Sequence, residues 1–365
     1  MKVKCDILII GAGIAGLWLL HSLKRKGYNA LLITDKGIGA GQTLASQGII
    51  HSGLKYTLAG KVNNLAKTIS QMPNRWRDAL NAQGDVDLST ATINSPSQYL
   101  MIPPGIAGNL IKIATQKTFG DSVQTSTSPY PAFKGHTLDM GEMVLDIPSI
   151  IRALAQPYRD CIKTAKLEEI EATTIIHTAA AGNQIIAKHN NHDKGLETQH
   201  RPLVMPLVKP APFELYAHFV GKSDKPIATV TTHKTESGEL VWYLGGQVGE
   251  RLIDSNPQDA IDATLEAFKT YLPNLDTSQF KWSHVAINRV EGKSGTKGFM
   301  PDTPTIHQVD HTMYCWPTKL TFAPMLADMV LERLDCVPSE QGDFSALQNA
   351  DYALAPWDDA EWTSL

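Results

Sequence analysis

The first 35 residues carry the pattern that most constrains the fold of this chain. An apolar stretch, KCDILII, is followed by the glycine-rich turn GAGIAG, by LWLLHSLKRKGY with helical spacing, and by a second apolar stretch, NALLITD, ending at Asp35. Buried strands and core-facing helices produce these two kinds of pattern, and Gly27 is a typical helix end. The order strand, turn, helix, strand predicts a βαβ unit.

The glycines of the turn indicate what this unit binds. Gly11 permits the turn, Gly13 lets a pyrophosphate approach the backbone, and Gly16 lets the helix pack closely on the strand. The helix N-terminus offers N–H groups and positive dipole to phosphates, and Asp35 is placed to accept hydrogen bonds from ribose hydroxyls. A turn used for packing alone is the alternative. The preceding strand, the following helix and the acid at the end of the second strand all match the dinucleotide-binding pattern. We therefore expect a dinucleotide with a free 2′-hydroxyl.

The composition indicates a globular protein that binds small ligands. The chain has 365 residues, of which 42% are hydrophobic and 19% charged, so it can bury a large core in one large domain or two interleaved ones. The formal net charge of −4 supplies no broad basic field. We therefore expect neither nucleic acid nor an anionic membrane surface as the main partner.

The cysteines and the N-terminus predict a cytoplasmic location. Cys5, Cys161, Cys315 and Cys336 are far apart and form no CxxC pair, which argues against a zinc site and a dense disulfide framework. Asp6 and the glycines interrupt the N-terminal apolar run, which argues against a signal peptide. No segment has the apolar length of a membrane span, so we expect no transmembrane segment.

The loop after the second strand, GQTLASQGIIHSGLKY, carries a resemblance to a known family. Together with the N-terminal fingerprint it resembles the D-amino-acid-oxidase-like (DAO) superfamily of FAD-dependent oxidoreductases. That superfamily includes glycerol-3-phosphate oxidases and dehydrogenases, 2-hydroxyglutarate dehydrogenases, glycine oxidase and sarcosine oxidase. ASQGIIHSGLKY is most similar to the hydroxy-acid and glycerol-3-phosphate branch. The resemblance implies FAD as cofactor, with this loop passing along its pyrophosphate and ribityl chain to the isoalloxazine.

Later segments support the resemblance. LDIPSIIRAL resembles the start of the second half of the FAD domain, ATTIIHTAAAGNQIIA the strand that returns under the cofactor, and residues 298–334 the closing strand, loop and helix. In that closing motif WPTKLTFAP replaces the usual glycine-rich loop. The cofactor-binding residues that the resemblance and the fingerprint imply are Gly11, Gly13, Ile14, Ala15, Gly16, Asp35, Lys36, Gln42, Thr43, Ser46, Gln47, Gly48, Ile49, Ala181, Gly182, Lys319, Leu320 and Thr321.

The resulting fold class is α/β, α+β overall, with a Rossmann-like FAD-binding domain and an interleaved antiparallel-sheet substrate domain. FELYAHFVGKSDKPIATVTTHKTESGELVWYLGGQVGE alternates as antiparallel strands do, and NPQDAIDATLEAFKTYLP has helical spacing. The expected boundaries are 1–85, 145–200 and 285–340 for the FAD-binding domain, 86–144 and 201–284 for the substrate domain, and 341–365 for a C-terminal tail packed on the surface.

His51, directly after the apolar pair Ile49 and Ile50, is the candidate catalytic base. An imidazole titrates near neutral pH and can accept the proton of a substrate hydroxyl. One alternative is a histidine that only hydrogen-bonds the cofactor or the backbone. Another is a histidine that carries a covalent flavin link, as in some members of the superfamily.

Two cations are further catalytic candidates. Lys319 is expected beside the flavin pyrimidine, where a cation stabilises the negative charge of the reduced ring. Arg289 is expected in the substrate cavity, where a guanidinium can hold a carboxylate or phosphate at two points. The alternatives are a surface lysine and an arginine paired with Glu291 or another acid. Tyr243 and Lys55 are weaker candidates for the cavity wall.

These features together predict an FAD-dependent oxidoreductase that dehydrogenates a small anionic substrate at a CH–OH carbon, with hydride transfer to flavin N5. A hydroxy acid or glycerol-3-phosphate is the first substrate class, and an amino acid or secondary amine is the alternative. Oxygen, a quinone and a carrier protein remain open as electron acceptors. A protein that binds FAD for structure, or within an RNA-modification assembly, is the alternative of another class.

Overall fold

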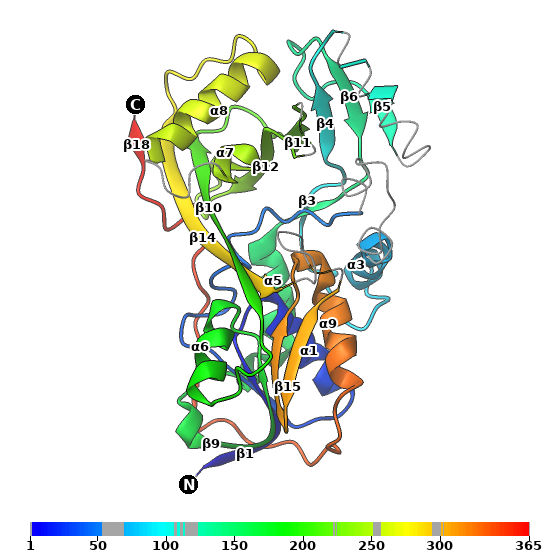
Figure 1. Cartoon of the computed structure of the whole chain (residues 1–365), viewed down its shortest axis with the longest axis vertical. Helices are drawn as coiled ribbons and strands as arrows, with labels where there is room; N and C mark the ends of the chain where they lie inside the picture. Colours follow the sequence, from blue (N-terminus) through cyan, green and yellow to red (C-terminus); the bar gives the residue numbers. More distant parts are fainter. Residues whose placement is uncertain are drawn as a thin grey trace.

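The computed structural model describes residues 2–52, 69–105, 108–109, 112–113, 123–221, 223, 225–250, 257–293, 301 and 303–364. Its elements form two lobes along the long axis of the molecule, each built around one large sheet (Figure 1). The N-terminus lies at the tip of one lobe and the C-terminus lies on the other.

The first sheet contains the βαβ unit expected at the N-terminus. Its strands are, in sheet order, β15 (Thr305–Val309), β16 (Thr312–Trp316), β9 (Ile170–His177), β1 (Val3–Ile10), β2 (Ala30–Ile33), β8 (Ile162–Thr164) and β17 (Gln348–Asn349). Strands β16, β9, β1, β2 and β8 are parallel, and β15 and β17 are antiparallel edges. Because β1 and β2 are buried along most of their length, both appear in the sequence as continuous apolar runs.

Helices pack on this sheet and place the glycine-rich turn at its carboxyl edge. They are α1 (Ile14–Arg25), α3 (Met72–Leu80), α5 (Ile147–Ala155), α6 (Ala181–His189) and α9 (Ala323–Leu331), with the 3-10 turns η3 (Gln156–Cys161), η4 (Leu167–Glu169) and η5 (Leu320–Phe322). Every residue of α1 from Ile14 to Leu23 is buried, because α1 contacts β1, β2, α5 and α9. The turn between β1 and α1 is therefore held between the sheet on one side and the helices packed on α1 on the other.

The second sheet is largely antiparallel. Its strands are, in sheet order, β18 (Thr363–Ser364), β14 (Lys281–Gly292), β10 (Thr198–Lys209), β13 (Leu240–Gly245), β12 (Ala228–Lys234), β11 (Ala217–Phe219), β4 (Tyr99–Ile102), β6 (His136–Asp139) and β5 (Gln124–Ser126). Among the strands of this sheet that the structure describes, only β11 and β4 pair in parallel. A small separate sheet joins β3 (Ile93–Ser95) to β7 (Val144–Leu145), and the helices of this lobe include α7 (Gln247–Glu250) and α8 (Pro257–Tyr271).

The two sheets confirm the predicted fold class. The alternating segment forms β11, β12 and β13, and the segment with helical spacing forms α8. Strands β10 and β14, each twelve residues long, pair along their full length and run from one lobe toward the other (Figure 1). The exact domain boundaries remain a prediction.

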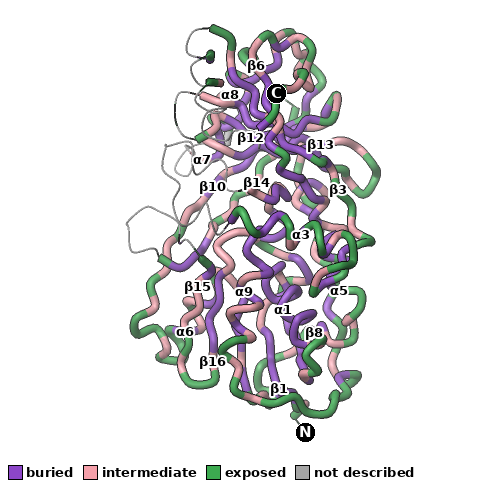
Figure 2. Tube along the Cα trace, turned by 90° about the vertical axis from the view of Figure 1, so that its right-hand side faces the viewer, coloured by how far each residue is buried: buried purple, intermediate pink, exposed green. Residues whose placement is uncertain are grey.

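Each lobe has a hydrophobic core of its own. The larger cluster surrounds α1 and includes Trp18 and Trp76, whose ring centroids lie 4.9 Å apart. The second cluster lies between the antiparallel sheet and α8 and includes Trp242 and Phe268. Figure 2 shows buried chain running through both lobes. Among the described residues, no helix has both the length and the apolar composition needed to cross a bilayer.

The C-terminal segment contacts both sheets rather than lying only on the surface. Strand β17 pairs with β8 of the first sheet, and β18 pairs with β14 of the second. Between them Trp357 is only 1% exposed and stacks on His233 of β12 at a centroid distance of 4.2 Å. The tail expected to pack on the surface therefore contains a fully buried side chain, and the partner of that side chain lies in a strand distant in the sequence.

Candidate active site

The glycine-rich turn lies where the carboxyl end of β1 meets that of β9. Gly11 has a φ of +113°, and a Cβ there would lie 2.9 Å from Ala179 N. Its N–H donates to Ile33 O at 2.9 Å, and its carbonyl accepts from Thr178 Oγ1 at 2.8 Å. A side chain at this position would strain the backbone and collide with the turn after β9, which explains the glycine.

The N-terminus of α1 opens from this turn. A Cβ at Gly13 would lie 2.9 Å from Thr43 Oγ1, which accepts a hydrogen bond from Ile14 N at 3.0 Å. A Cβ at Gly16 would lie 2.0 Å from Gly11 O, so only glycine lets the helix approach the turn. The first turn of a helix has N–H groups without intrahelical partners, and these suit the phosphates of a dinucleotide.

Two hydroxyls among the predicted cofactor residues are buried without a partner. Neither Ser46 Oγ nor Thr321 Oγ1 has a hydrogen-bond partner among the residues that the structure describes. Buried polar groups are normally paired, so an unpaired one indicates a missing ligand, water or ion. These hydroxyls, the tight turn at Gly11 and the N-terminus of α1 all fit a bound dinucleotide.

Other predicted cofactor residues of this region differ in exposure. Asp35 and Lys36 follow β2 and are exposed, Gln42 is half-buried, and Ala15 is buried in α1. Asp35 therefore stands at the end of the second strand, where the fingerprint expects the ribose-binding acid. Ile49 is buried and pairs with Val144.

The turn after β9 is organised by residues that the sequence interpretation did not select. Ala181 and Gly182 form the first turn of α6, whereas Thr178 contacts the glycine-rich turn. Asn183 is fully buried, and its Oδ1 accepts from Ala179 N at 2.8 Å. Its Nδ2 donates to the carbonyls of His177 and Cys315, which joins β9 to β16. A polar residue directly after an apolar strand was the available signal for Thr178.

The loop WPTKLTFAP enters α9 through η5. Thr318 has a φ of +66°, and Lys319 precedes η5 in an extended conformation and is half-buried. Leu320 and Thr321 lie in η5 itself, and Thr321 O accepts a hydrogen bond from Trp76 Nε1 at 3.0 Å. The loop WPTKLTFAP, which stands where the DAO superfamily usually has a glycine-rich loop, therefore forms an ordered turn that is hydrogen-bonded to α3.

Gln47 and Tyr243 attach the predicted cofactor loop to the second sheet. Gln47 Nε2 donates to the carbonyls of Thr229 and Tyr243, both at 2.9 Å, and lies 3.3 Å from Thr231 Oγ1. Tyr243 Oη donates to Ala45 O at 2.9 Å. Tyr243 is thus an anchor of the loop, while Lys55, the other weak candidate for the cavity wall, lies outside the described residues.

His51 lies beside a buried carboxylate that the sequence interpretation missed. The segment Gly48–Ser52 runs antiparallel to residues 142–145, with Leu145 N donating to Gly48 O and Ile50 N to Met143 O, both at 2.9 Å. His51 Nδ1 then lies 3.0 Å from Oε2 of Glu142. Glu142 is only 1% exposed. No sequence signal indicated this pairing, because the two segments are about ninety residues apart.

Arg289 is engaged by residues of its own lobe. Its Nη2 lies 3.7 Å from Glu250 Oε1, and its Nε donates to Arg201 O at 3.4 Å. The expected alternative partner, Glu291, is buried and pairs instead with Arg201 Nε at 3.0 Å. With a side chain one-third exposed, Arg289 retains access to solvent.

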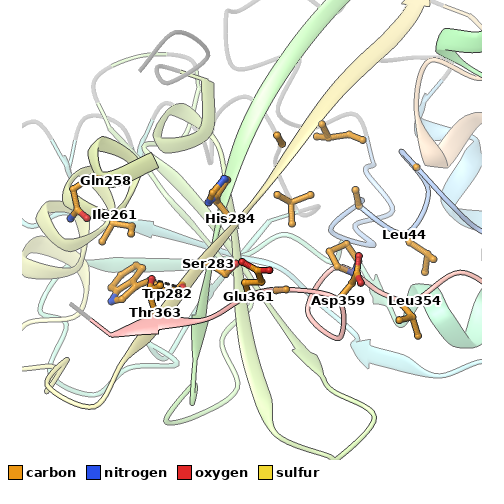
Figure 3. Close-up of a pocket in the computed structure, with 17 residues that line it drawn as sticks. Leu44, Gln258, Ile261, Trp282, Ser283, His284, Leu354, Asp359, Glu361 and Thr363 are labelled. Carbon is orange, nitrogen blue, oxygen red and sulfur yellow. Dashed lines mark hydrogen bonds between the residues drawn. The ribbon is translucent and has the colours of Figure 1, made fainter. Parts of the chain in front are cut away.

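A cavity of about 840 Å³ lies between the loop Gly41–Ala45, strand β14 and the C-terminal segment (Figure 3). Its walls include Leu44, Ser283 and Asp359, but neither the glycines of the βαβ turn nor His51. Because neither His51 nor the glycines of the turn line this cavity, we do not assign it as the catalytic pocket.

The fold and the site together define a two-sheet dinucleotide-binding protein, and comparison with known proteins identifies the family. Residues 6–93 match the family model for DAO, FAD dependent oxidoreductase. The probable FAD-dependent oxidoreductase PA4991 of Pseudomonas aeruginosa is 36% identical over 390 residues, which cover 98% of each chain. The chain belongs to the DAO family of FAD-dependent oxidoreductases.

Solved structures show the same fold. The crystal structure of PA4991 superposes with a TM-score of 0.81 at 30% structure-aligned identity, covering 98% of both chains. Glycine oxidase from Geobacillus kaustophilus gives a TM-score of 0.64 at 12% identity, covering 96% of this chain and 99% of its own. L-α-glycerophosphate oxidase from Mycoplasma pneumoniae gives 0.62 at 14%, covering 94% and 98%. The last two likenesses concern the fold alone.

Family membership confirms three predictions. FAD is the cofactor, the chain is an oxidoreductase, and the protein is an enzyme rather than an assembly component that binds FAD for structure. A flavoenzyme of this kind needs a substrate that gives up a hydride equivalent and an electron acceptor that reoxidises the flavin. The roles of the individual site residues remain predictions.

Proposed function

We propose that this enzyme dehydrogenates a small anionic substrate at a CH–OH carbon, with a hydroxy acid or glycerol-3-phosphate as the substrate class. The observation that supports the proposal best is the contact of His51 Nδ1 with the buried carboxylate of Glu142 at 3.0 Å. An imidazole beside a carboxylate is a suitable base for a hydroxyl proton. Amine substrates are the alternative that the experiment below distinguishes.

The proposed step is an oxidation of an alcohol to a carbonyl. His51 Nε2 takes the O–H proton of the substrate, the electron pair of that bond forms the second C–O bond, and the carbon loses its hydrogen with two electrons. Bound FAD supplies the acceptor for that hydride. The protonated imidazole then forms an ion pair with Glu142, which stabilises the charge that develops on His51.

Cationic side chains support the choice of an anionic substrate. Arg289 lies on β14 with its side chain one-third exposed, and Lys319 lies half-buried before η5. A guanidinium binds a carboxylate or phosphate with two parallel hydrogen bonds. We assign Arg289 to substrate binding and Lys319 to the flavin pyrimidine as parts of the same proposal.

The expected cytoplasmic location and the open choice of acceptor also belong to this proposal. All four cysteines are unpaired, as a reducing compartment favours. Oxygen, a quinone or a carrier protein can each reoxidise a flavin of this family, and the identity of the acceptor follows from reoxidation rates measured with each of them.

The test is anaerobic flavin reduction by a panel of hydroxy acids, glycerol-3-phosphate, amino acids and secondary amines, followed by visible absorption. We expect bleaching by a hydroxy acid or glycerol-3-phosphate, and a His51→Ala variant that retains FAD but is reduced about 10²- to 10⁴-fold more slowly. His284→Ala, at an exposed position of β14, is the matched control. Bleaching by amines alone, or normal reduction of His51→Ala, would overturn the proposal.

A further inference from the structure

The carboxylate of Glu142 contacts two consecutive residues of the cofactor loop. Oε2 lies 3.0 Å from His51 Nδ1, while Oε1 accepts from both the backbone N–H and the Oγ–H of Ser52 at 2.8 Å. The glutamate side chain has no solvent exposure, and that of His51 is 15% exposed. Both oxygens are thus used to fix the end of the segment that carries His51.

The backbone of the two segments determines this contact. Residues 48–50 pair antiparallel with residues 143–145, which brings residue 142 level with residue 51. A Cβ at Gly48, whose φ is +75°, would lie 2.2 Å from Leu145 O. The glycine at position 48 therefore permits the approach of the segment that carries Glu142.

The burial of Glu142 constrains which nitrogen of His51 carries the hydrogen. Moving a carboxylate out of water is costly unless it is paired and hydrogen-bonded. Glu142 obtains two hydrogen bonds from Ser52 and one contact with His51. An ionised carboxylate only accepts hydrogen bonds, so the ring nitrogen that faces it carries the proton. In neutral His51 the hydrogen is then on Nδ1, and Nε2 has the lone pair.

We propose that Glu142 is a positioning residue for the oxidation, because it fixes His51 in the tautomer whose Nε2 accepts the substrate proton. The inference rests on the base role proposed for His51. A carboxylate on Nδ1 does two things: it sets the orientation of the ring, and it stabilises the imidazolium formed when Nε2 is protonated. Glu142 itself stays ionised and transfers no proton.

The first measurement needs no substrate. In ¹⁵N-histidine NMR spectra of the FAD-loaded enzyme, with His51 assigned by its loss in His51→Ala, we expect a single tautomer with hydrogen on Nδ1. In Glu142→Gln we expect a mixture of tautomers or the Nε2–H form, because an amide can donate to the ring. Ser52→Ala is the matched control, since it removes one bond to Glu142 but leaves the histidine contact. An unchanged tautomer in Glu142→Gln would overturn the inference.

The second measurement is the rate of flavin reduction by glycerol-3-phosphate or 2-hydroxyglutarate, whichever bleaches the wild-type enzyme. We expect Glu142→Gln to lower the rate about 10²-fold with FAD content and substrate KM little changed. In the His51→Ala background the same change should add less than about twofold, because both residues act as one unit. Equal slowing in both backgrounds would show a structural role and overturn the positioning role.

The outcomes separate this inference from the proposed function. Normal reduction of His51→Ala contradicts the base role, whatever the spectra of Glu142→Gln show. Slow reduction of His51→Ala, combined with an unchanged tautomer and a normal rate in Glu142→Gln, contradicts only the role of Glu142. A Glu142→Gln protein that loses FAD or melts early is replaced by Glu142→Asp, which keeps the charge and should retain the Nδ1–H tautomer.

Discussion

The turn that is predicted to bind the pyrophosphate and the segment that carries His51 are held in different ways. Gly11 and Ile14 are fixed by backbone geometry and by Thr43, 29 residues from Ile14. The segment Gln47–Ser52 is fixed by side chains far away in the sequence: Glu142 lies 91 residues from His51, and Gln47 donates to carbonyls 182 and 196 residues away. The first is shaped by glycine spacing that the sequence shows, although Thr178, 167 residues from Gly11, also holds it. The second depends on side-chain contacts between distant segments.

This difference teaches how cofactor binding and chemistry are divided between the two regions. Phosphate binding by a βαβ turn needs glycines, a helix N-terminus and little else. The placement of His51 needs contacts from residues 142–145 and from the second sheet. A family built this way can change its chemistry at the second region without altering how the first binds FAD.

The largest expected effect comes from breaking the local region alone. Gly16→Ala places a Cβ 2.0 Å from the carbonyl oxygen of Gly11, so α1 must move away from the turn. We expect FAD affinity to fall at least about tenfold and the free energy of unfolding to fall by about 2–3 kcal/mol. Flavin fluorescence titration and urea unfolding measure the two.

The control for that change lies in the loop after β2. Gly41 has a positive φ, of +75°, and a Cβ there meets nothing within 4 Å. Gly41→Ala should therefore cost only about 1 kcal/mol of backbone strain and retain FAD. Equal loss of FAD in both variants would mean that the contact between position 16 and the carbonyl oxygen of Gly11 does not decide binding.

The second prediction breaks the distant contact and leaves the phosphate turn intact. Gly48→Ala puts a Cβ 2.2 Å from Leu145 O and so shifts His51 relative to Glu142. We expect a smaller loss of FAD than in Gly16→Ala and a rate of flavin reduction, in the FAD-loaded fraction, lowered about 10- to 100-fold, because small misplacements of a catalytic group are costly. Anaerobic stopped-flow absorption gives the rate.

Gly141→Ala is the control on the opposite segment. Gly141 has a φ of +59°, and a Cβ there meets nothing within 4 Å, although Glu142 is the next residue. We expect it to keep the reduction rate within a few-fold of wild type. If Gly48→Ala lost FAD but its FAD-loaded fraction were reduced at the normal rate, the segment around residue 48 would serve FAD binding rather than the placement of His51.

The smallest predicted effect concerns a buried histidine in each sheet. Burial lowers the pKa of His233 in β12 to about 3 and that of His177 in β9 to about 4. Both lie below the ordinary value near 6.5, so the unfolded chain binds more protons as the pH falls. Stability is therefore complete above about pH 6.5 and falls below it, by up to about 1.4 kcal/mol per pH unit for each histidine.

Urea unfolding at pH 7 and pH 5 tests whether the two sheets unfold together. In His233→Phe and in His177→Phe we expect the loss of stability between these pH values to shrink by about 2 kcal/mol each. His284→Phe, at an exposed position, should leave the loss unchanged. A reduced loss in only one variant, with two transitions, would show that the sheets unfold separately.

Much of the fold followed from local patterns. The strand, turn and helix at the N-terminus, the antiparallel segment from 217 to 245 and α8 were predicted, because apolar periodicity and turn residues act over short stretches. Burial of Trp357 and the pairing of β17 and β18 with different sheets were not predicted. Those contacts join residues that no short-range pattern connects.

The sequence by itself determined the dinucleotide turn, the class of cofactor and the place of His51 in the chain, because glycine spacing and strand ends encode local backbone geometry. Only the tertiary structure decided that Glu142 faces His51 and that Gln47 anchors the loop to β12 and β13. Glutamate and glutamine are common residues whose roles depend on what burial places beside them, and burial is a property of the whole packed chain.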